Sequence, residues 1–136
     1  MNCLSFDVGG TTVKYGVIDE SYKILKKDKI PTPENENDFI YSLSNIIQEN
    51  LSIISKVSVA MPGYVNSANN KYLYGPHLKY DIDFSKLSNF TDYKFHLDND
   101  GNVAAYCEYF LNYKTKYSNL IMLTFGTGVG GGIISE

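Results

Sequence analysis

The chain has 136 residues, of which 43% are hydrophobic and 20% charged, and this suits one domain with a buried core. Its net charge of -3 argues against nucleic-acid binding, which usually needs a basic face. No apolar stretch approaches the roughly 18 residues of a membrane span, and no signal peptide precedes Asp7. These features predict a cytoplasmic protein that binds neither nucleic acid nor a membrane.

Three short apolar segments open the chain, and the turns between them predict an antiparallel meander with strands at residues 2–7, 13–18 and 22–30. Apolar residues at helical spacing then predict an amphipathic helix over residues 37–50.

The rest of the chain alternates strand-like and helix-like segments. The elements expected there are a strand at 53–60, a hairpin with its tip at Asn69 and Asn70, a short helix at 84–90, a strand at 94–97, a helix with an apolar face, a strand at 119–125, a glycine-rich turn at 126–132 and a new strand from Ile133. The apolar face of the second helix comprises Val103, Ala104, Tyr106, Cys107, Phe110 and Leu111. This order predicts an α/β fold with a mixed sheet, antiparallel first strands and flanking helices.

The two cysteines, Cys3 and Cys107, lack the spacing of a metal site. We interpret both as small buried residues.

A first glycine loop, DVGGTTVK, joins the first two predicted strands. Successive backbone N–H groups in such a loop can cradle a phosphate, and the threonine hydroxyls and lysine add donors and charge. A carboxylate at the mouth of the loop can hold Mg²⁺ through water. The residues concerned are Asp7, Gly9, Gly10, Thr11, Thr12 and Lys14. A plain Gly-Gly hairpin is the alternative.

A second glycine loop begins with Gly126, Thr127 and Gly128. With Gly131 it forms a G-x-G-x-x-G pattern, but a dinucleotide site needs a helix directly after the loop. Here Ile133 begins an apolar strand-like segment, so a phosphate loop between two strands fits better.

A polar segment, Asp98 to Asn102, lies between a predicted strand and a helix. Helix capping is the simple interpretation. The carboxyl end of a strand is also a usual ligand position, and the helix dipole favours an ionised Asp100. We therefore expect Asp100 to accept a hydroxyl proton and Asn99 to hydrogen-bond a polyol.

Four segments together resemble the ROK family of bacterial sugar kinases and related repressors. They are Asp7–Lys14, Met61–Val65, Asp98–Ala105 and Leu123–Gly132, in the family's order. The resemblance covers nearly the whole chain. It implies a ribonuclease-H-like fold of the actin-like ATPase type.

The resemblance also implies a role for each matching residue. Asp100 matches the catalytic base, and Asn99 and Gly63 match sugar-contacting positions. Asp7 matches the acid on the Mg²⁺ side, and the two glycine loops match the ATP phosphate loops. His77 stands where the family often has a sugar-contacting Asn, so we expect it to alter the choice of sugar. The implied reaction is transfer of a phosphoryl group from ATP with Mg²⁺ to a hexose or N-acetylhexosamine.

The predicted domain organisation follows from the same resemblance. Residues 1–118 would be the N-terminal ATPase domain, and residues 119–136 the start of an otherwise absent C-terminal domain. The family's structural zinc motif would lie beyond residue 136, the full-length protein would be a homodimer, and this chain alone would be inactive. The sugar-sensing part of a ROK repressor is the alternative; with Met1 directly before the first strand, no helix-turn-helix is expected, which favours the kinase.

Overall fold

A computed structural model describes residues 1–89, 93–126 and 128–135 of the chain. The strands are β1 (Cys3–Val8), β2 (Thr12–Ile18), β3 (Ile24–Pro31), β4 (Lys56–Met61), β5 (Tyr64–Asn66), β6 (Lys71–Tyr74), β7 (Ile82–Asp83), β8 (Lys94–Asn99), β9 (Asn119–Phe125) and β10 (Val129–Ser135). The helices are α1 (Glu36–Asn50) and α2 (Asp100–Glu108), with 3₁₀ turns at Ser67–Asn69 and Phe84–Asn89 and a π-helical turn at Tyr109–Tyr113. The chain divides into two compact units, Met1–Asp98 and Asn99–Glu136.

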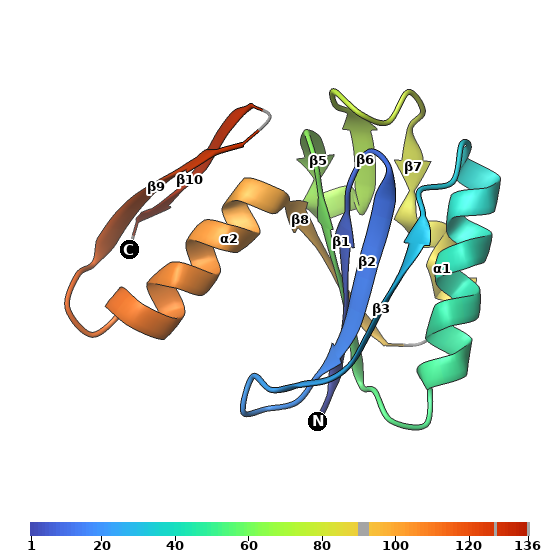
Figure 1. The fold of residues 1–136 in the computed structure, drawn as a ribbon, viewed down its shortest axis with the longest axis horizontal. Coiled ribbons are helices and arrows are strands. Elements are labelled where there is room, and N and C mark those ends of the chain that lie inside the picture. Colours follow the sequence, from blue (N-terminus) through green and yellow to red (C-terminus); the bar gives the residue numbers. More distant parts are fainter. Residues whose placement is uncertain (90–92, 127, 136) are drawn as a thin grey trace. The chain divides into compact units, whose positions relative to one another are not determined.

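The first unit is built on a five-stranded sheet in the order β3-β2-β1-β4-β8 (Figure 1). The strand β1 lies at its centre and pairs antiparallel with β2 and parallel with β4. Because β2 also pairs antiparallel with β3, the predicted antiparallel meander is confirmed. The predicted mixed sheet is confirmed as well.

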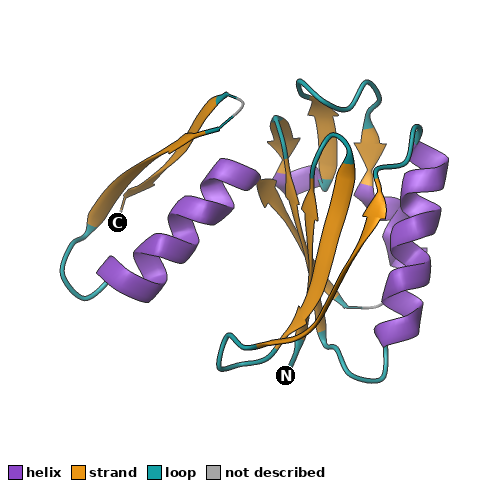
Figure 2. Ribbon diagram, viewed as in Figure 1, coloured by secondary structure: helices purple, strands orange, loops and turns teal. Residues whose placement is uncertain are grey.

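The helix α1 covers one face of this sheet (Figure 2). Its N-cap is Asn35, whose side-chain oxygen accepts a hydrogen bond from the Asp38 amide at 3.0 Å. Its buried residues Phe39, Leu43 and Ile47 have no exposed surface. They form one hydrophobic core with alternate residues of the central strands, including Leu4, Phe6, Val57 and Val59. Burial of this apolar surface makes the main favourable contribution to the folding free energy of the unit.

A second sheet of the first unit contains the short strands β5, β6 and β7, all antiparallel. The hairpin between β5 and β6 turns at Asn69 and Asn70, as predicted, and Asn70 adopts the left-handed conformation with φ 52°. The short helix expected at residues 84–90 is a 3₁₀ helix over Phe84–Asn89, and Phe90 lies outside the described residues.

The second unit contains α2 and the antiparallel pair β9 and β10. Here the prediction of a glycine turn over residues 126–132 is wrong, because β10 already begins at Val129. The apolar residues predicted to form one face of this helix are not buried within the unit: Tyr106, Phe110 and Leu111 are exposed, whereas Ala105 is buried. Small residues of α2 instead lie close to β10, as described below.

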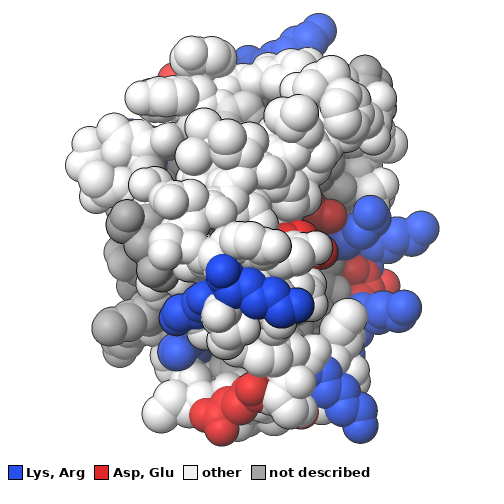
Figure 3. Space-filling model, turned by 90° about the vertical axis from the view of Figure 1, so that its left-hand side faces the viewer, with Lys and Arg blue, Asp and Glu red and all other residues white. Residues whose placement is uncertain are grey.

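The outer face of β9 and β10 is apolar and exposed. Ile121 and Ile133 are directly paired across the strands, as are Phe125 and Val129. Each of these four side chains is more than 70% exposed. Much of the upper part of the face drawn in Figure 3 is likewise free of Lys, Arg, Asp and Glu.

Within the described part of the chain, no helix is long and apolar enough to cross a membrane.

The two cysteines differ in how far they are buried. Cys3 is half-buried in β1, where its thiol lies 3.6 Å from the Ser58 hydroxyl. Cys107 is exposed on α2. The prediction that both are buried is therefore wrong for Cys107, because that side of α2 faces away from its own unit's core.

Candidate functional site

The first glycine loop follows the central strand of the five-stranded sheet. Val8 pairs with Val13, so the four residues between them form a tight hairpin turn. The Gly9 amide closes this turn by donating to the Thr12 carbonyl at 3.0 Å. Short hydrogen-bonded turns of this kind fix the backbone path. The predicted loop between β1 and β2 is therefore present and well defined.

Thr32, which follows β3, holds the loop from the side. Its hydroxyl donates to the Gly9 carbonyl at 2.7 Å, and its amide donates to the Thr11 carbonyl at 3.0 Å. These bonds orient two carbonyls toward Thr32 and do not involve the amides of Gly10 and Thr11.

Asp7 and Lys14 lie directly opposite each other on β1 and β2. The Asp7 carboxylate is 3.9 Å from the Lys14 ammonium, and the two side chains are 63% and 71% exposed. An exposed ion pair at this distance contributes little to stability. Both charges lie at the strand ends that flank the loop and are exposed to solvent. Among the described residues, no group of three or more His, Cys, Asp or Glu side chains could hold a metal ion.

The Pro-Gly turn after β4 packs against the segment after β6. Gly63 has φ +96°, and a Cβ on it would come within 2.5 Å of the Tyr74 carbonyl oxygen. A Cβ on Gly75 would come within 2.6 Å of the Pro62 carbonyl oxygen. Only glycine fits both positions, because the two backbones touch and Gly63 is in the left-handed region. The predicted sugar-side turn is thus joined to the segment that contains His77.

His77 lies against the first glycine loop. A Cβ on Gly10 would come within 2.7 Å of the His77 Cβ and within 3.4 Å of its Nδ1. The structure therefore brings together, within the first unit, a residue predicted to contact sugar and a residue predicted to contact phosphate.

In the second unit, Asn99 caps α2. Its side-chain oxygen accepts hydrogen bonds from the amides of Gly101 and Asn102 at 2.9 and 3.2 Å. Asp100 is exposed in the first turn, where its carboxylate accepts from the Gly101 amide at 2.8 Å. The capping interpretation is confirmed for Asn99. Asp100 thus lies at the N-terminal end of α2, directly after its cap.

The first turn of α2 approaches β10 backbone to backbone. A Cβ on Gly101 would lie 2.7 Å from the Gly131 carbonyl oxygen, and a Cβ on Gly132 would lie 2.6 Å from the Ala105 Cβ. Glycines in a strand commonly mark such close approaches. Gly131 follows Gly128 by three positions, which is about 10 Å of extended chain. This contact joins the start of α2, where Asp100 lies, to the strand that follows the second glycine loop.

The second glycine loop is the turn between β9 and β10. The Gly126 amide donates to the Gly128 carbonyl at 2.9 Å, and a Cβ on either glycine would meet nothing within 4 Å. Thr127, also predicted to contact phosphate, lies outside the described residues.

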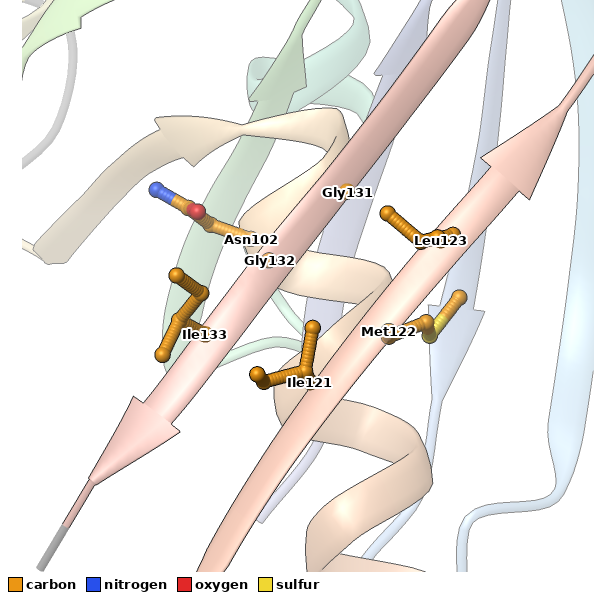
Figure 4. Close-up of a pocket in the computed structure, with 7 residues that line it drawn as sticks. All are labelled: Asn102, Ile121, Met122, Leu123, Gly131, Gly132 and Ile133. Atoms are coloured by element: carbon orange, nitrogen blue, oxygen red, sulfur yellow. The ribbon is translucent and has the colours of Figure 1, made fainter.

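A surface pocket of the second unit lies beside this region. Its lining residues are Asn102, Ile121, Met122, Leu123, Gly131, Gly132 and Ile133 (Figure 4). Asn102 is the only one of them with a hydrogen-bonding side chain. The pocket is therefore an apolar surface between β9 and β10 rather than an anion site.

The motifs and the fold agree with one protein family. The family model described as "ROK family" matches residues 3–136. The chain belongs to the ROK family. It is 30% identical over 136 residues to the glucokinase of Streptomyces coelicolor, with 96% of this chain and 43% of that protein covered. It is 32% identical over 142 residues to the N-acetylmannosamine kinase of Pasteurella multocida, with 100% and 47% covered.

The structure is similar to that of a ROK family glucokinase from Streptomyces griseus in complex with glucose and AMPPNP. The TM-score is 0.83 at 27% identity, and the match covers 99% of this chain and 45% of that one. This likeness to a ROK sugar kinase confirms the actin-like ATPase fold. The chain spans less than half the length of these three relatives. The domain boundary predicted at residue 118 stays a prediction.

Sequence reasoning missed several residues that shape the site. The sequence does not predict a role for Thr32, because a single threonine after a strand that ends in proline forms no recognisable motif. The glycine pattern predicts a turn at Gly131 and Gly132, although their direct continuation into Ile133 is a signal of a strand that needs close packing.

Proposed function

We propose that the full-length protein containing this chain transfers the γ-phosphoryl group of ATP to a hydroxyl of a hexose or N-acetylhexosamine. The observation that carries this proposal is the match of residues 3–136 to the ROK family, whose relatives reported above are named glucokinase and N-acetylmannosamine kinase. Because the chain spans less than half of those relatives, this chain alone is expected to be inactive, with adenosine contacts and any structural zinc supplied elsewhere.

On the phosphate side, the two glycine loops would bind ATP. The residues proposed are Gly9, Gly10, Thr11, Thr12, Lys14, Gly126, Thr127 and Gly128. Backbone amides and the lysine would neutralise phosphate charge, and Asp7 would hold Mg²⁺ through water. Phosphoryl transfer depends almost entirely on such positioning and charge neutralisation.

On the sugar side, Asp100 would accept the proton of the attacking hydroxyl. Its exposure and its place in the first turn of α2 support a carboxylate that a sugar can reach. Asn99 and Gly63 would contact the sugar. The contact between α2 and β10 would hold the base at a fixed distance from the second phosphate loop.

The test is an ADP-release assay of the full-length protein with MgATP and a sugar panel. The panel contains glucose, N-acetylglucosamine, N-acetylmannosamine and fructose. We expect turnover with at least one of them and none with residues 1–136 alone. If every sugar failed, while the full-length protein bound DNA in a sugar-dependent way, the ROK repressor alternative would replace the kinase. Size measurement of the full-length protein would test the proposed homodimer.

A further inference from the structure

The contact between Gly10 and His77 concerns two exposed loop residues. Both are exposed in the first unit, so the contact does not arise from burial in the core. A Cβ on Gly10 would meet the Cβ of His77 at 2.7 Å and its Cγ at 3.0 Å. Real Cβ atoms do not approach each other so closely, so the histidine itself excludes any larger residue from this loop position.

The segment carrying His77 is held on both sides. Before it, Gly75 is packed against the Pro62 carbonyl. After it, Leu78 is buried, with 4% of its surface exposed, and its carbonyl accepts from the Tyr72 hydroxyl at 3.5 Å. Anchors at both ends reduce the conformational freedom of the histidine between them. His77 is therefore held against Gly10 rather than resting there as a mobile loop tip.

A second connection joins this segment to the same loop. The Tyr80 hydroxyl donates to the Pro33 carbonyl, and burial raises the pKa of Tyr80 to about 12, so that it remains a protonated donor. Pro33 directly follows Thr32, whose hydroxyl and amide hold the glycine loop. The His77 segment and the phosphate loop are thus connected at two points, by direct contact and through the segment after β3.

We propose that His77 is a positioning residue for the phosphate group at the first glycine loop. The proposal rests on the kinase function above and differs from the sugar-selecting role that the family resemblance implies for this position. The imidazole would set the conformation of Gly10 and offer a ring N–H to an oxygen of a phosphate bound by the loop. Hydrogen bonds from such donors to charged oxygens are among the stronger ones in proteins.

The test measures AMPPNP and sugar binding to the full-length protein separately, in the presence of Mg²⁺. We expect His77→Ala to weaken AMPPNP binding about tenfold and to change sugar affinity less than twofold. His77→Asn, which retains an amide donor, should recover part of the loss. The matched control is His96→Ala, which removes an exposed histidine from β8 and should leave AMPPNP binding unchanged. A loss confined to sugar affinity would overturn the proposal, as would unchanged AMPPNP binding in His77→Ala.

The contact itself is tested by thermal unfolding of the full-length protein. Gly10→Ala should lower the melting temperature, and His77→Gly should remove most of that loss in the double variant, because the clash needs both Cβ atoms. Additive losses would overturn the proposed contact. A protein that binds AMPPNP through His77 but phosphorylates no sugar would refute the proposed kinase function while leaving this inference intact.

Discussion

Gly132 of β10 lies so close to Ala105 of α2 that a Cβ on the glycine would come within 2.6 Å of the alanine Cβ. The same Cβ would lie 2.9 Å from the Gly101 carbonyl oxygen. A helix and a strand that meet through backbone atoms have little room to adjust. The packing of the second unit, and with it the place of Asp100, therefore depends on residues with minimal side chains.

This contact predicts that Gly132→Ala destabilises the second unit by about 1–3 kcal/mol through overpacking. Chemical denaturation of the full-length protein would measure the loss. Ala105→Gly should recover part of it in the double variant, because it removes one of the two clashing groups. The control is Gly126→Ala, where an added Cβ meets nothing within 4 Å. Equal effects at Gly126 and Gly132 would contradict the packing argument.

The sequence predicts the first unit well because local patterns and long-range packing agree there. Alternating buried residues in β1 and the helical spacing in α1 lead to the same core that the structure contains. In the second unit the pattern misleads, since Tyr106 and Phe110 follow helical spacing but are exposed and stacked on each other, with ring centroids 6.1 Å apart. Apolar periodicity cannot indicate that a helix packs through Gly101 and Ala105 instead.

The candidate site likewise combines residues that local sequence patterns predict with a contact that they do not predict. The glycine loops and Asp100 were found because each lies at a junction of predicted elements. The approach of His77 to Gly10 joins residues 67 positions apart, and nothing in local sequence specifies it. Contacts of this kind depend on how β6 and β7 are placed beside β1, which is a property of the tertiary fold.

Asp100→Asn tests the proposed base. The amide keeps the size of the side chain and an oxygen that can accept from Gly101, so the capping of α2 by Asn99 should persist. Loss of a general base typically costs about 10²–10⁴-fold in turnover. We expect kcat to fall in this range while AMPPNP binding is retained. Asp98→Asn, which removes a neighbouring exposed acid, is the control. Undiminished turnover in Asp100→Asn would show that the base assignment is wrong.

Asp7→Asn tests the proposed metal contact. Removing a carboxylate that holds Mg²⁺ through water should weaken metal affinity by about 10–100-fold. The concentration of Mg²⁺ needed for half-maximal ADP release should rise accordingly, with little effect on stability, because the Asp7 and Lys14 side chains form only a long, exposed ion pair. Asp28→Asn on β3 removes another exposed acid and serves as the control. An unchanged Mg²⁺ dependence would exclude Asp7 from the metal site.

Glu36 provides a prediction for stability against pH. Its carboxylate lies 2.6 Å from the Lys86 ammonium and accepts from the Asp83 amide at 2.9 Å, which ties the start of α1 to β7 and the following 3₁₀ helix. The hydrogen bond from Lys86, followed by that from the Asp83 amide, lowers the pKa of Glu36. A group whose pKa is lower in the folded state stabilises the fold above its ordinary pKa, and this contribution is lost as the pH falls through the folded value.

Glu36→Gln should therefore lower the free energy of unfolding by up to about 1 kcal/mol at pH 7. The difference from wild type should shrink as the pH falls below the ordinary glutamate value of about 4.3. Glutamine keeps an oxygen for the Asp83 amide, so the substitution isolates the charge. Urea denaturation at a series of pH values measures both quantities. Glu34→Gln, two residues earlier on the exposed surface, is the control, and a Glu36→Gln loss that stayed constant down to pH 3 would contradict an electrostatic origin.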